Sequence, residues 1–323
     1  MKKNILLITP IKHIPRVFDL LEKSFNVYYF PDFKYKDLDK LKNVNFYAIY
    51  TNPNKSRVRI DKKIIDALSD LKYVVTASTG TNHIEKKLLK QKKIKLISLT
   101  RDLKTIKTIS STAELAFALT LNAIRNIDEA SRSVRNGEWD YLPFVGRQMN
   151  KLNILIVGFG RLGKMYYKYA KSFGSTIKVC DPYVQTNTNN SNVCFVDLIE
   201  GVKDADIISL HIHHTEETEK IINKKILKRC KDNVTIINTS RGEIVDEDDV
   251  VDFLRSNKSS KYYTDVISDE IRSKSKNILL KENIKNTNIF ITPHIGGMTL
   301  DAQQIAFERV ATKLFELNSN NLV

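Results

Sequence analysis

The sequence predicts an α/β protein with two domains, each built around a parallel sheet. Its 323 residues exceed the usual size of one compact domain. Short apolar runs alternate with segments of helical spacing, and this alternation occurs in two separate series along the chain. Hydrophobic residues make up 42% and charged residues 28%, without a long polar or repetitive tract, so we expect both domains to be folded throughout.

Each series supplies the strands of one predicted sheet. In the first series, the apolar runs are separated by segments such as Ile64, Ile65 and Leu68, whose spacing is typical of one helix face. The strands expected from this series are Ile5 to Ile8, Phe46 to Ile49, Tyr73 to Val75 and Ile94 to Ile97. The second series predicts strands at Ile154 to Val157, Ile177 to Val179, Ile207 to Leu210, Val234 to Ile237 and Tyr262 to Val266.

Two segments outside these series decide the domain boundaries. Residues Ser111 to Arg135 contain neither Gly nor Pro and predict one long, well-buried helix that links the domains. The end of the chain, with a strand at Ile289 to Ile291 and a helix from about Asp301, is too small to bury its own core. We therefore expect two Rossmann-like domains with parallel sheets: a discontinuous substrate domain of residues 1–105 and 289–323, and a continuous domain of residues 106–288.

Charge and cysteine content disfavour several other classes of protein. The net charge is +15, but the basic pairs are scattered, without the single stripe and interleaved aromatic residues typical of nucleic-acid binding. No apolar stretch approaches the roughly 20 residues that cross a bilayer, and the first apolar run is shorter than a signal peptide needs. The three cysteines, Cys180, Cys194 and Cys230, predict neither a disulfide framework nor a zinc site. We expect a cytoplasmic protein that binds neither nucleic acid nor membranes.

A glycine motif predicts a dinucleotide site in the second series. The sequence Gly158-Phe159-Gly160-Arg161-Leu162-Gly163 follows a predicted strand directly and opens a helix that runs to about Phe173. The first glycine permits a tight turn, the second lets backbone approach a pyrophosphate, and the third lets helix and strand pack closely. The phosphates would then lie at the helix N-terminus. The alternative is a structural turn that binds no ligand.

An acidic residue at the end of the next strand, Asp181, indicates which dinucleotide binds. Its carboxylate can accept hydrogen bonds from ribose hydroxyls and would repel a 2′-phosphate. Pro182 and Tyr183 follow, without a neighbouring Arg or Lys that could neutralise such a phosphate. The sequence therefore favours NAD over NADP, although an isolated Asp at this position could be a capping residue.

Three further segments hold polar groups suited to hydride transfer, and each follows a predicted strand. Residues at the carboxyl ends of parallel strands point into the crevice where ligands bind, so these segments could converge. The segments are Asn238-Thr239-Ser240-Arg241-Gly242, Asp265-Val266-Ile267-Ser268-Asp269-Glu270 and Thr292-Pro293-His294-Ile295-Gly296-Gly297.

The order of these motifs resembles that of the D-isomer-specific 2-hydroxyacid dehydrogenases, a family that includes D-3-phosphoglycerate dehydrogenase, over nearly the whole chain. Besides the segments above, the resemblance rests on the loop Ser78-Thr79-Gly80-Thr81-Asn82, the helix start Ser111-Thr112-Ala113-Glu114, and Gly137 with Trp139. It implies an enzyme that transfers a hydride between NAD and the α-carbon of a small D-2-hydroxy acid. It also implies a homodimer joined through the NAD-binding domain.

The resemblance assigns three catalytic residues. It implies that Arg241 binds the substrate carboxylate and polarises its carbonyl, a task suited to guanidinium because it offers two parallel donors and stays charged. His294 would act as general acid and base on the substrate oxygen, and Glu270 would hold its imidazole and favour the protonated form. Each of these residues taken alone could be a surface or structural residue.

The same resemblance implies contacts to the cofactor and the substrate. Asp265 would contact the nicotinamide carboxamide, with Gly297 and the backbone around Ile212 and Thr239 lining the pocket. Backbone amides of Ser78, Thr79 and Gly80 would contact the substrate carboxylate, although a plain turn would also explain this glycine.

The sequence departs from the family pattern in two loops. His211 is followed by Ile212-His213-His214-Thr215 where the family commonly has Pro-Leu, so we expect a different loop beside the nicotinamide. A metal site at these histidines is disfavoured because no matching Asp, Glu or Cys spacing accompanies them. Ile271 follows Glu270 where the family usually has proline, which predicts a looser backbone. Because no further βαβ unit follows, we expect no regulatory C-terminal domain.

The resemblance leaves several substrates and one other class of function open. Substrate candidates are 3-phosphoglycerate, glyoxylate-like acids and sugar-derived keto acids, and Lys55, Arg57 or Arg59 would serve a phosphorylated substrate. The other class is a dinucleotide-sensing binding protein, like the corepressor members of this fold family. The presence of all three predicted catalytic residues favours the enzyme.

Overall fold

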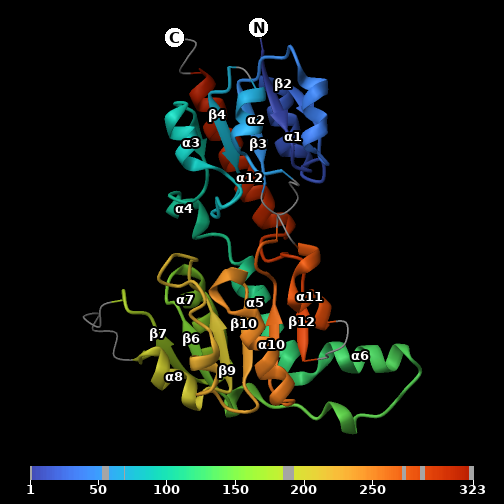
Figure 1. The fold of residues 1–323 in the computed structure, drawn as a ribbon, viewed down its shortest axis with the longest axis vertical. Helices are drawn as coiled ribbons and strands as arrows, with labels where there is room; N and C mark the ends of the chain where they lie inside the picture. Colours follow the sequence, from blue (N-terminus) through green and yellow to red (C-terminus); the bar gives the residue numbers. More distant parts are fainter. Residues whose placement is uncertain are drawn as a thin grey trace. The chain divides into compact units, whose positions relative to one another are not determined.

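The computed structural model describes residues 2–52, 58–68, 70–184, 193–270, 274–283 and 288–319. The chain forms two compact units, each with its own parallel sheet (Figure 1). The first unit consists of residues 1–109 and 298–323, and the second of residues 110–297. The predicted α/β fold with two Rossmann-like domains, one of them discontinuous, is confirmed.

The sheet of the first unit has the strand order β2-β1-β3-β4-β5. Because successive side chains of a strand point to opposite faces, Ile5 and Leu7 enter one hydrophobic core, and Leu6 and Ile8 enter the other. The strands are β1 (Lys3–Leu7), β2 (Phe25–Tyr29), β3 (Ala48–Thr51), β4 (Tyr73–Thr76) and β5 (Lys95–Ile97). One face is covered by α1 (Pro15–Ser24), α4 (Leu103–Ile106) and α12 (Leu300–Ser319), and the other by η1 (Tyr35–Leu41), α2 (Lys62–Ala67) and α3 (Lys86–Gln91).

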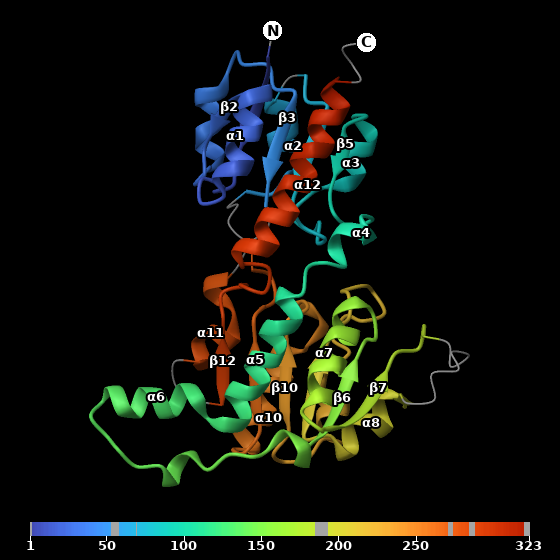
Figure 2. The same cartoon turned by 180° about the vertical axis from the view of Figure 1, so that it is seen from behind.

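The C-terminal helix α12 completes the first unit (Figure 2). The ring of Phe307 stacks on that of Tyr50 at 5.9 Å, and the Tyr50 hydroxyl donates to the Phe307 carbonyl oxygen at 3.0 Å. Lys313 and Arg309 bind the carboxylate of Asp102, just before α4, at 2.7 and 2.6 Å. These two cations hold the pKa of Asp102 well below its ordinary value. Neither α12 nor any other helix within the described ranges is long and apolar enough to span a membrane.

The sheet of the second unit has seven parallel strands in the order β12-β11-β10-β9-β6-β7-β8. They are β6 (Asn153–Val157), β7 (Thr176–Cys180), β8 (Cys194–Phe195), β9 (Ile207–Leu210), β10 (Thr235–Asn238), β11 (Lys261–Thr264) and β12 (Ile289–Ile291). The predicted boundary at residue 289 is wrong, because β12 pairs with β11 and belongs to this sheet. Tyr263 lies opposite Phe290 in that pairing, and their rings stack 5.0 Å apart.

Helices cover both faces of the second sheet. One face carries α5 (Ser111–Arg125) and α7 (Arg161–Ser172), and the other carries α8 (Leu198–Asp204), α9 (Lys224–Leu227), α10 (Glu247–Ser256) and α11 (Ile278–Asn283). The single helix expected over residues 111–135 is wrong, because Asn126 adopts a left-handed conformation with φ 52° and separates α5 from α6 (Ile127–Arg135). Lys261 stabilises this break, since its Nζ contacts the Asn126 side chain and donates to the Ala123 carbonyl oxygen at 3.1 Å.

Candidate active site

The predicted site residues of the second unit lie at the carboxyl ends of its strands. The strand order runs outward from β6 in both directions, with β7 and β8 on one side and β9 to β12 on the other. Ligands bind parallel sheets at such a switch point, outside the carboxyl ends of the strands. The glycine motif follows β6 and Asp181 follows β7, while Ile212, Arg241, Glu270 and His294 follow β9, β10, β11 and β12 in turn.

The glycine motif forms a tight turn with open space at its centre. Gly158 has φ +93°, and a side chain there would come within 2.6 Å of the His211 carbonyl oxygen. A Cβ at Gly163 would lie 2.0 Å from the Gly158 carbonyl oxygen, so the strand and α7 pack too closely for any other residue. At Gly160, which precedes α7, a Cβ would meet nothing within 4 Å. Backbone at this helix N-terminus is therefore accessible to a pyrophosphate, with Arg161 and Leu162 opening the helix.

Asp181 is held against the glycine turn. One carboxylate oxygen accepts a hydrogen bond from the Phe159 amide at 2.7 Å, and the other accepts one from the Tyr183 amide at 2.9 Å. A carboxylate has lone pairs for about four hydrogen bonds, so Asp181 retains acceptor capacity for a ribose diol. The Tyr183 hydroxyl in turn contacts the Glu217 carboxylate, which adds a second negative charge near this end of the site.

Residues expected to line the nicotinamide pocket also fit a bound dinucleotide. Thr239 is 6% exposed, and its Oγ1 is buried without a hydrogen-bond partner in the part of the chain that the structure describes. Such a buried hydroxyl is suited to a ligand, because buried polar groups are nearly always paired. Ile212 packs beside Gly158, and a Cβ at Gly297 would meet nothing within 4 Å.

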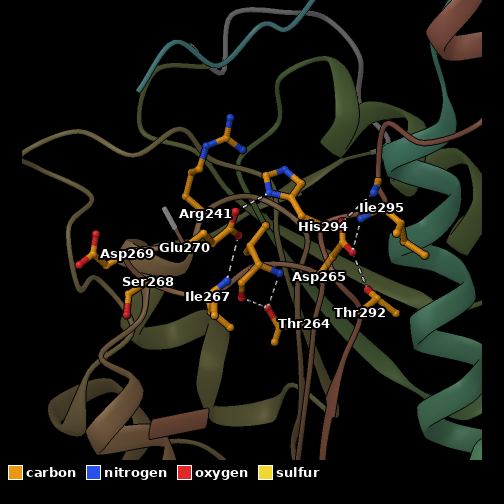
Figure 3. A network of polar contacts seen from close by, with 12 residues as sticks. Arg241, Thr264, Asp265, Ile267, Ser268, Asp269, Glu270, Thr292, His294 and Ile295 are labelled. Atoms are coloured by element: carbon orange, nitrogen blue, oxygen red, sulfur yellow. Dashed lines mark hydrogen bonds and ion pairs between the residues drawn. The ribbon is translucent and has the colours of Figure 1, made fainter. Parts of the chain in front are cut away.

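The structure pairs the predicted acid–base residue with its predicted partner. His294 Nδ1 lies 2.7 Å from Glu270 Oε2, and the two side chains are 24% and 29% exposed (Figure 3). The other Glu270 oxygen accepts a hydrogen bond from the Ile267 amide at 3.2 Å. His294 has φ 57°, a left-handed conformation that is uncommon for residues other than glycine and clusters at functional sites.

Asp265 holds the turn that presents His294, a role that the sequence analysis missed. The Asp265 side chain accepts hydrogen bonds from Thr292 Oγ1 at 2.5 Å and from the amides of Ile295 and Gly296, both at 2.7 Å (Figure 3). Asp265 is 1% exposed, and this burial raises its pKa, although the three donors and His294 act in the opposite direction. The structure shows Asp265 bound to the 292–296 turn, and its predicted contact with nicotinamide stays a prediction.

The Arg241 side chain and the His294 ring extend in the same direction beyond the carboxyl ends of the strands (Figure 3). Asn238, the last residue of β10, fixes the Arg241 loop by donating to the Arg241 carbonyl oxygen at 2.9 Å. A Cβ at Gly242 would lie 2.0 Å from the carbonyl carbon of Ile267, so the Arg241 loop packs directly on the segment that leads to Glu270. Arg241, Glu270 and His294 therefore come from three adjacent strand ends.

The predicted substrate loop lies in the first unit, directly after β4. The Gly80 amide donates to Ser78 Oγ at 3.0 Å, and Thr100 Oγ1 donates to the Thr79 carbonyl oxygen at 2.8 Å, so the loop is held in a defined turn. Of the cations considered for a phosphorylated substrate, Lys55 and Arg57 lie outside the described residues, as does Ile271 of the predicted looser segment.

The three histidines after β9 do not gather around a common point. His211 Nε2 lies 2.9 Å from Ser209 Oγ, and the His211 ring lies 5.0 Å from that of Tyr166. Burial lowers the pKa of His211 to about 3, so this imidazole is neutral. His213 is exposed, and His214 lies 3.9 Å from a Glu219 oxygen. Among the residues with described positions, no three His, Cys, Asp or Glu side chains form a group that could hold a metal ion.

Comparisons with known proteins place the chain among dehydrogenases. The model for the NAD-binding domain of D-isomer specific 2-hydroxyacid dehydrogenases matches residues 117–296. A hydroxypyruvate reductase from Thermotoga maritima is 32% identical over 267 residues, which cover 81% of this chain and 82% of that protein. A D-3-phosphoglycerate dehydrogenase from Methanocaldococcus jannaschii is 31% identical over 279 residues, 86% of this chain but only 50% of that protein.

A solved structure extends the likeness to both units. The D-lactate dehydrogenase from Aquifex aeolicus, complexed with NAD and lactic acid, has a TM-score of 0.78 and 23% identity, covering 99% of this chain and 96% of that one. At this identity the likeness concerns the fold. The family model and the sequence relatives favour the dehydrogenase over the dinucleotide-sensing alternative. Because the family model matches residues 117–296, more than half of the chain, and the hydroxypyruvate reductase aligns over 81% of it, the chain belongs to the D-isomer specific 2-hydroxyacid dehydrogenases, NAD-dependent oxidoreductases that act on the CH–OH group of 2-hydroxy acids.

Proposed function

We propose that Arg241, Glu270 and His294 catalyse the interconversion of a small 2-keto acid and its D-2-hydroxy acid. The observation that carries this proposal is the 2.7 Å contact between His294 Nδ1 and Glu270 Oε2 at the strand ends beside Arg241. With Nδ1 engaged, Nε2 is the ring nitrogen that serves the substrate oxygen. Both side chains are enclosed enough to be oriented and exposed enough to be reached.

Each side chain has one task in the proposed reduction. The bound cofactor supplies the hydride that adds to C2 of the keto acid. His294 donates a proton from Nε2 to the carbonyl oxygen, so that the C=O group becomes CH–OH. Glu270 stabilises the imidazolium before this proton leaves, and Arg241 binds the substrate carboxylate and polarises the carbonyl. In the oxidation, neutral His294 accepts the hydroxyl proton.

The remaining predicted contacts complete the proposal. Asp181 accepts hydrogen bonds from the adenine ribose of NAD, and Asp265, besides holding the 292–296 turn, accepts one from the nicotinamide carboxamide. Thr239 Oγ1, which is buried and has no partner among the residues described, pairs with the cofactor. The backbone of the Ser78-Thr79-Gly80 turn in the first unit binds the substrate carboxylate, which makes that unit the substrate domain.

The names of the relatives suggest which acids to test first. Hydroxypyruvate is our first candidate, because the hydroxypyruvate reductase aligns over about four fifths of both chains (81% and 82%). Glyoxylate is the second, since a glyoxylate reductase from Thermococcus litoralis is also 32% identical. A 3-phosphoglycerate-like acid is the third, because this chain matches only half of the D-3-phosphoglycerate dehydrogenase.

We also propose a cytoplasmic homodimer joined through the second unit. Helix α6 has no buried residues, and with the segment after it extends away from the sheet of its unit (Figures 1 and 2). This arm exposes large apolar side chains, including Trp139 at 90%, Tyr141 at 80% and Val145 at 75%. Apolar surface of this extent is typical of an interface. The free thiols of Cys180, Cys194 and Cys230 fit a reducing compartment.

Two experiments test these proposals. NADH oxidation should be measured with hydroxypyruvate, glyoxylate, pyruvate and 3-phosphohydroxypyruvate, and we expect turnover with at least one of the first two. Absence of turnover with all four acids, by protein that binds NADH, would contradict the catalytic proposal. Sedimentation equilibrium should give twice the chain mass of 37.1 kDa, and a mass of one chain would contradict the dimer.

A further inference from the structure

A buried carboxylate that the mechanism does not use lies close to the catalytic pair. Glu247 begins α10 and is 7% exposed, and among the described residues no Lys, Arg or His pairs with it. Its oxygens instead accept hydrogen bonds from the Ser268 amide and Ser268 Oγ, both at 2.6 Å, and from Asn277 Nδ2 at 2.5 Å. Burial, with a smaller effect of the Glu243 charge, raises the pKa of Glu247, and the three donors act against this. Burying a carboxylate without a countercharge is costly, which points to a role beyond folding.

The hydrogen bonds of Glu247 fasten the segment that carries Glu270. Ser268 lies two residues before Glu270, and both its amide and its hydroxyl are bound to Glu247. The segment then turns back sharply, because Asp269 has φ 50° and the Ile267 amide donates to Glu270 Oε1 at 3.2 Å. The position of the Glu270 carboxylate next to His294 thus depends on where Ser268 is held.

The Arg241 loop packs directly against the same segment. A Cβ at Gly242 would lie 2.0 Å from both the Ile267 carbonyl carbon and the Ser268 nitrogen, so the two backbones are in direct contact. Glu247 follows Gly242 by only five residues in the sequence. The 3-10 helix η4 (Gly242–Ile244), Val245 and Asp246 connect the two. Glu247 therefore lies close in sequence to Arg241, and it also binds the segment that carries Glu270.

Asn277 joins this network to α11. Its Oδ1 accepts a hydrogen bond from the Leu279 amide at 3.0 Å, while its Nδ2 donates to Glu247 and lies 3.3 Å from Ser268 Oγ. The same side chain thus caps the start of α11 and supports the Glu247–Ser268 contact. Glu247 lies in the first turn of α10, and Asn277 directly precedes α11, so the network connects the Ser268 segment to two helices.

From these contacts we propose that Glu247 is a positioning residue, which locks Ser268 so that Glu270 stays aligned with His294 and the Arg241 loop. The inference rests on the proposed function above, because it concerns the pair that handles the proton. Without the Glu247–Ser268 hydrogen bonds, the Glu270 carboxylate could move away from His294. Such a movement would lower the rate of proton transfer and would weaken the electrostatic stabilisation of the His294 imidazolium.

A reciprocal exchange of donor and acceptor provides the test. Glu247→Gln places an amide NH₂ group against the Asn277 NH₂ group, so one donor loses its acceptor. Adding Asn277→Asp restores the pairing with its direction reversed, and the new carboxylate can still cap α11. Asp248→Asn is the matched control, because it removes an exposed carboxylate from the same first turn of α10. Ser268→Ala is a milder variant that removes one of the two Ser268 contacts.

The readouts are kcat, KM and the pH dependence of keto-acid reduction for folded full-length protein, with Glu270→Gln as reference. We expect Glu247→Gln to lower kcat by at least about tenfold. The rate of reduction decreases at alkaline pH, and we expect this decrease, here called the alkaline fall, to occur at lower pH in Glu247→Gln, as in Glu270→Gln. Ser268→Ala should move it less, the double variant should return both kcat and pH profile toward wild type, and Asp248→Asn should change neither.

The outcomes separate this inference from the proposed function. If Glu270→Gln moves the alkaline fall but Glu247→Gln and Ser268→Ala leave it in place, Glu247 has only a structural role and the inference is overturned. The same conclusion follows if the double variant regains the wild-type melting temperature without regaining kcat. If Glu270→Gln itself leaves the pH profile unchanged, the proposed Glu270–His294 pairing fails and the inference fails with it.

Discussion

Acid should destabilise the second unit through His211. Burial lowers the pKa of this imidazole to about 3, whereas an unfolded histidine titrates near about 6.5. Between these two values the unfolded chain binds a proton that the folded chain does not. The stability due to neutral His211 is therefore fully present above about pH 6.5 and is lost as the pH falls. Each pH unit in this window costs about 1.4 kcal/mol, which amounts to about 2 kcal/mol at pH 5.

His211→Gln isolates this effect. Glutamine retains a polar group for the contact that His211 Nε2 makes with Ser209 Oγ at 2.9 Å, but it does not titrate. The free energy of unfolding should be measured in urea at pH 7 and pH 5 for both proteins, so that the contributions of all other groups cancel. Between the two pH values, wild type should lose about 2 kcal/mol more than the variant. Equal losses would refute the reasoning.

Three further substitutions test other parts of the structure. Asp181→Ala should narrow the preference for NAD over NADP by about tenfold, the effect of one screened charge; an unchanged ratio of kcat/KM values would remove Asp181 from the ribose site. Arg241→Lys should lower kcat/KM for the keto acid by about a hundredfold while KM for NADH stays constant, because an ammonium cannot bind a carboxylate through two parallel donors; near-normal rates would contradict this role. Asp102→Asn should destabilise the chain by about 2 kcal/mol at pH 7, because Lys313 and Arg309 lose their anion. Since the folded pKa of Asp102 is depressed, this difference should shrink in urea titrations as the pH falls below about 3.9, and a constant difference would argue against the ion pairs.

Local patterns explain why the elements and the glycine motif could be predicted from the sequence. Strands such as β6 are buried on both faces and therefore form continuous apolar runs, and the glycines act within a few residues of one another. The break between α5 and α6 was missed because Asn126 leaves the helical region with the help of Lys261, far away in sequence. The pairing of β12 likewise depends on which sheet edge is open in the folded chain.

The hydrogen bonds that support the proposed catalytic residues could not be predicted, for a similar reason. Asp265 binds the turn at 292–296, and Glu247 binds Ser268 and Asn277, so each buried carboxylate finds its donors 20 or more residues away. The sequence shows an acidic residue in each place but gives no measure of its burial. A resemblance to a family transfers the residues that touch ligands, whereas the hydrogen bonds that hold those residues become visible only in the folded structure.

The central claim is that this chain reduces a 2-keto acid with NADH to the D isomer, using His294 as the proton donor. The most direct measurement combines NADH oxidation by wild type and His294→Asn with chiral analysis of the 2-hydroxy acid formed from hydroxypyruvate or pyruvate, both of which give a product with a stereocentre at C2. We expect the D isomer alone from wild type, and a loss of kcat by at least about a hundredfold in the variant with NADH binding retained. An L or racemic product, or a His294→Asn variant with wild-type kcat, would contradict the account.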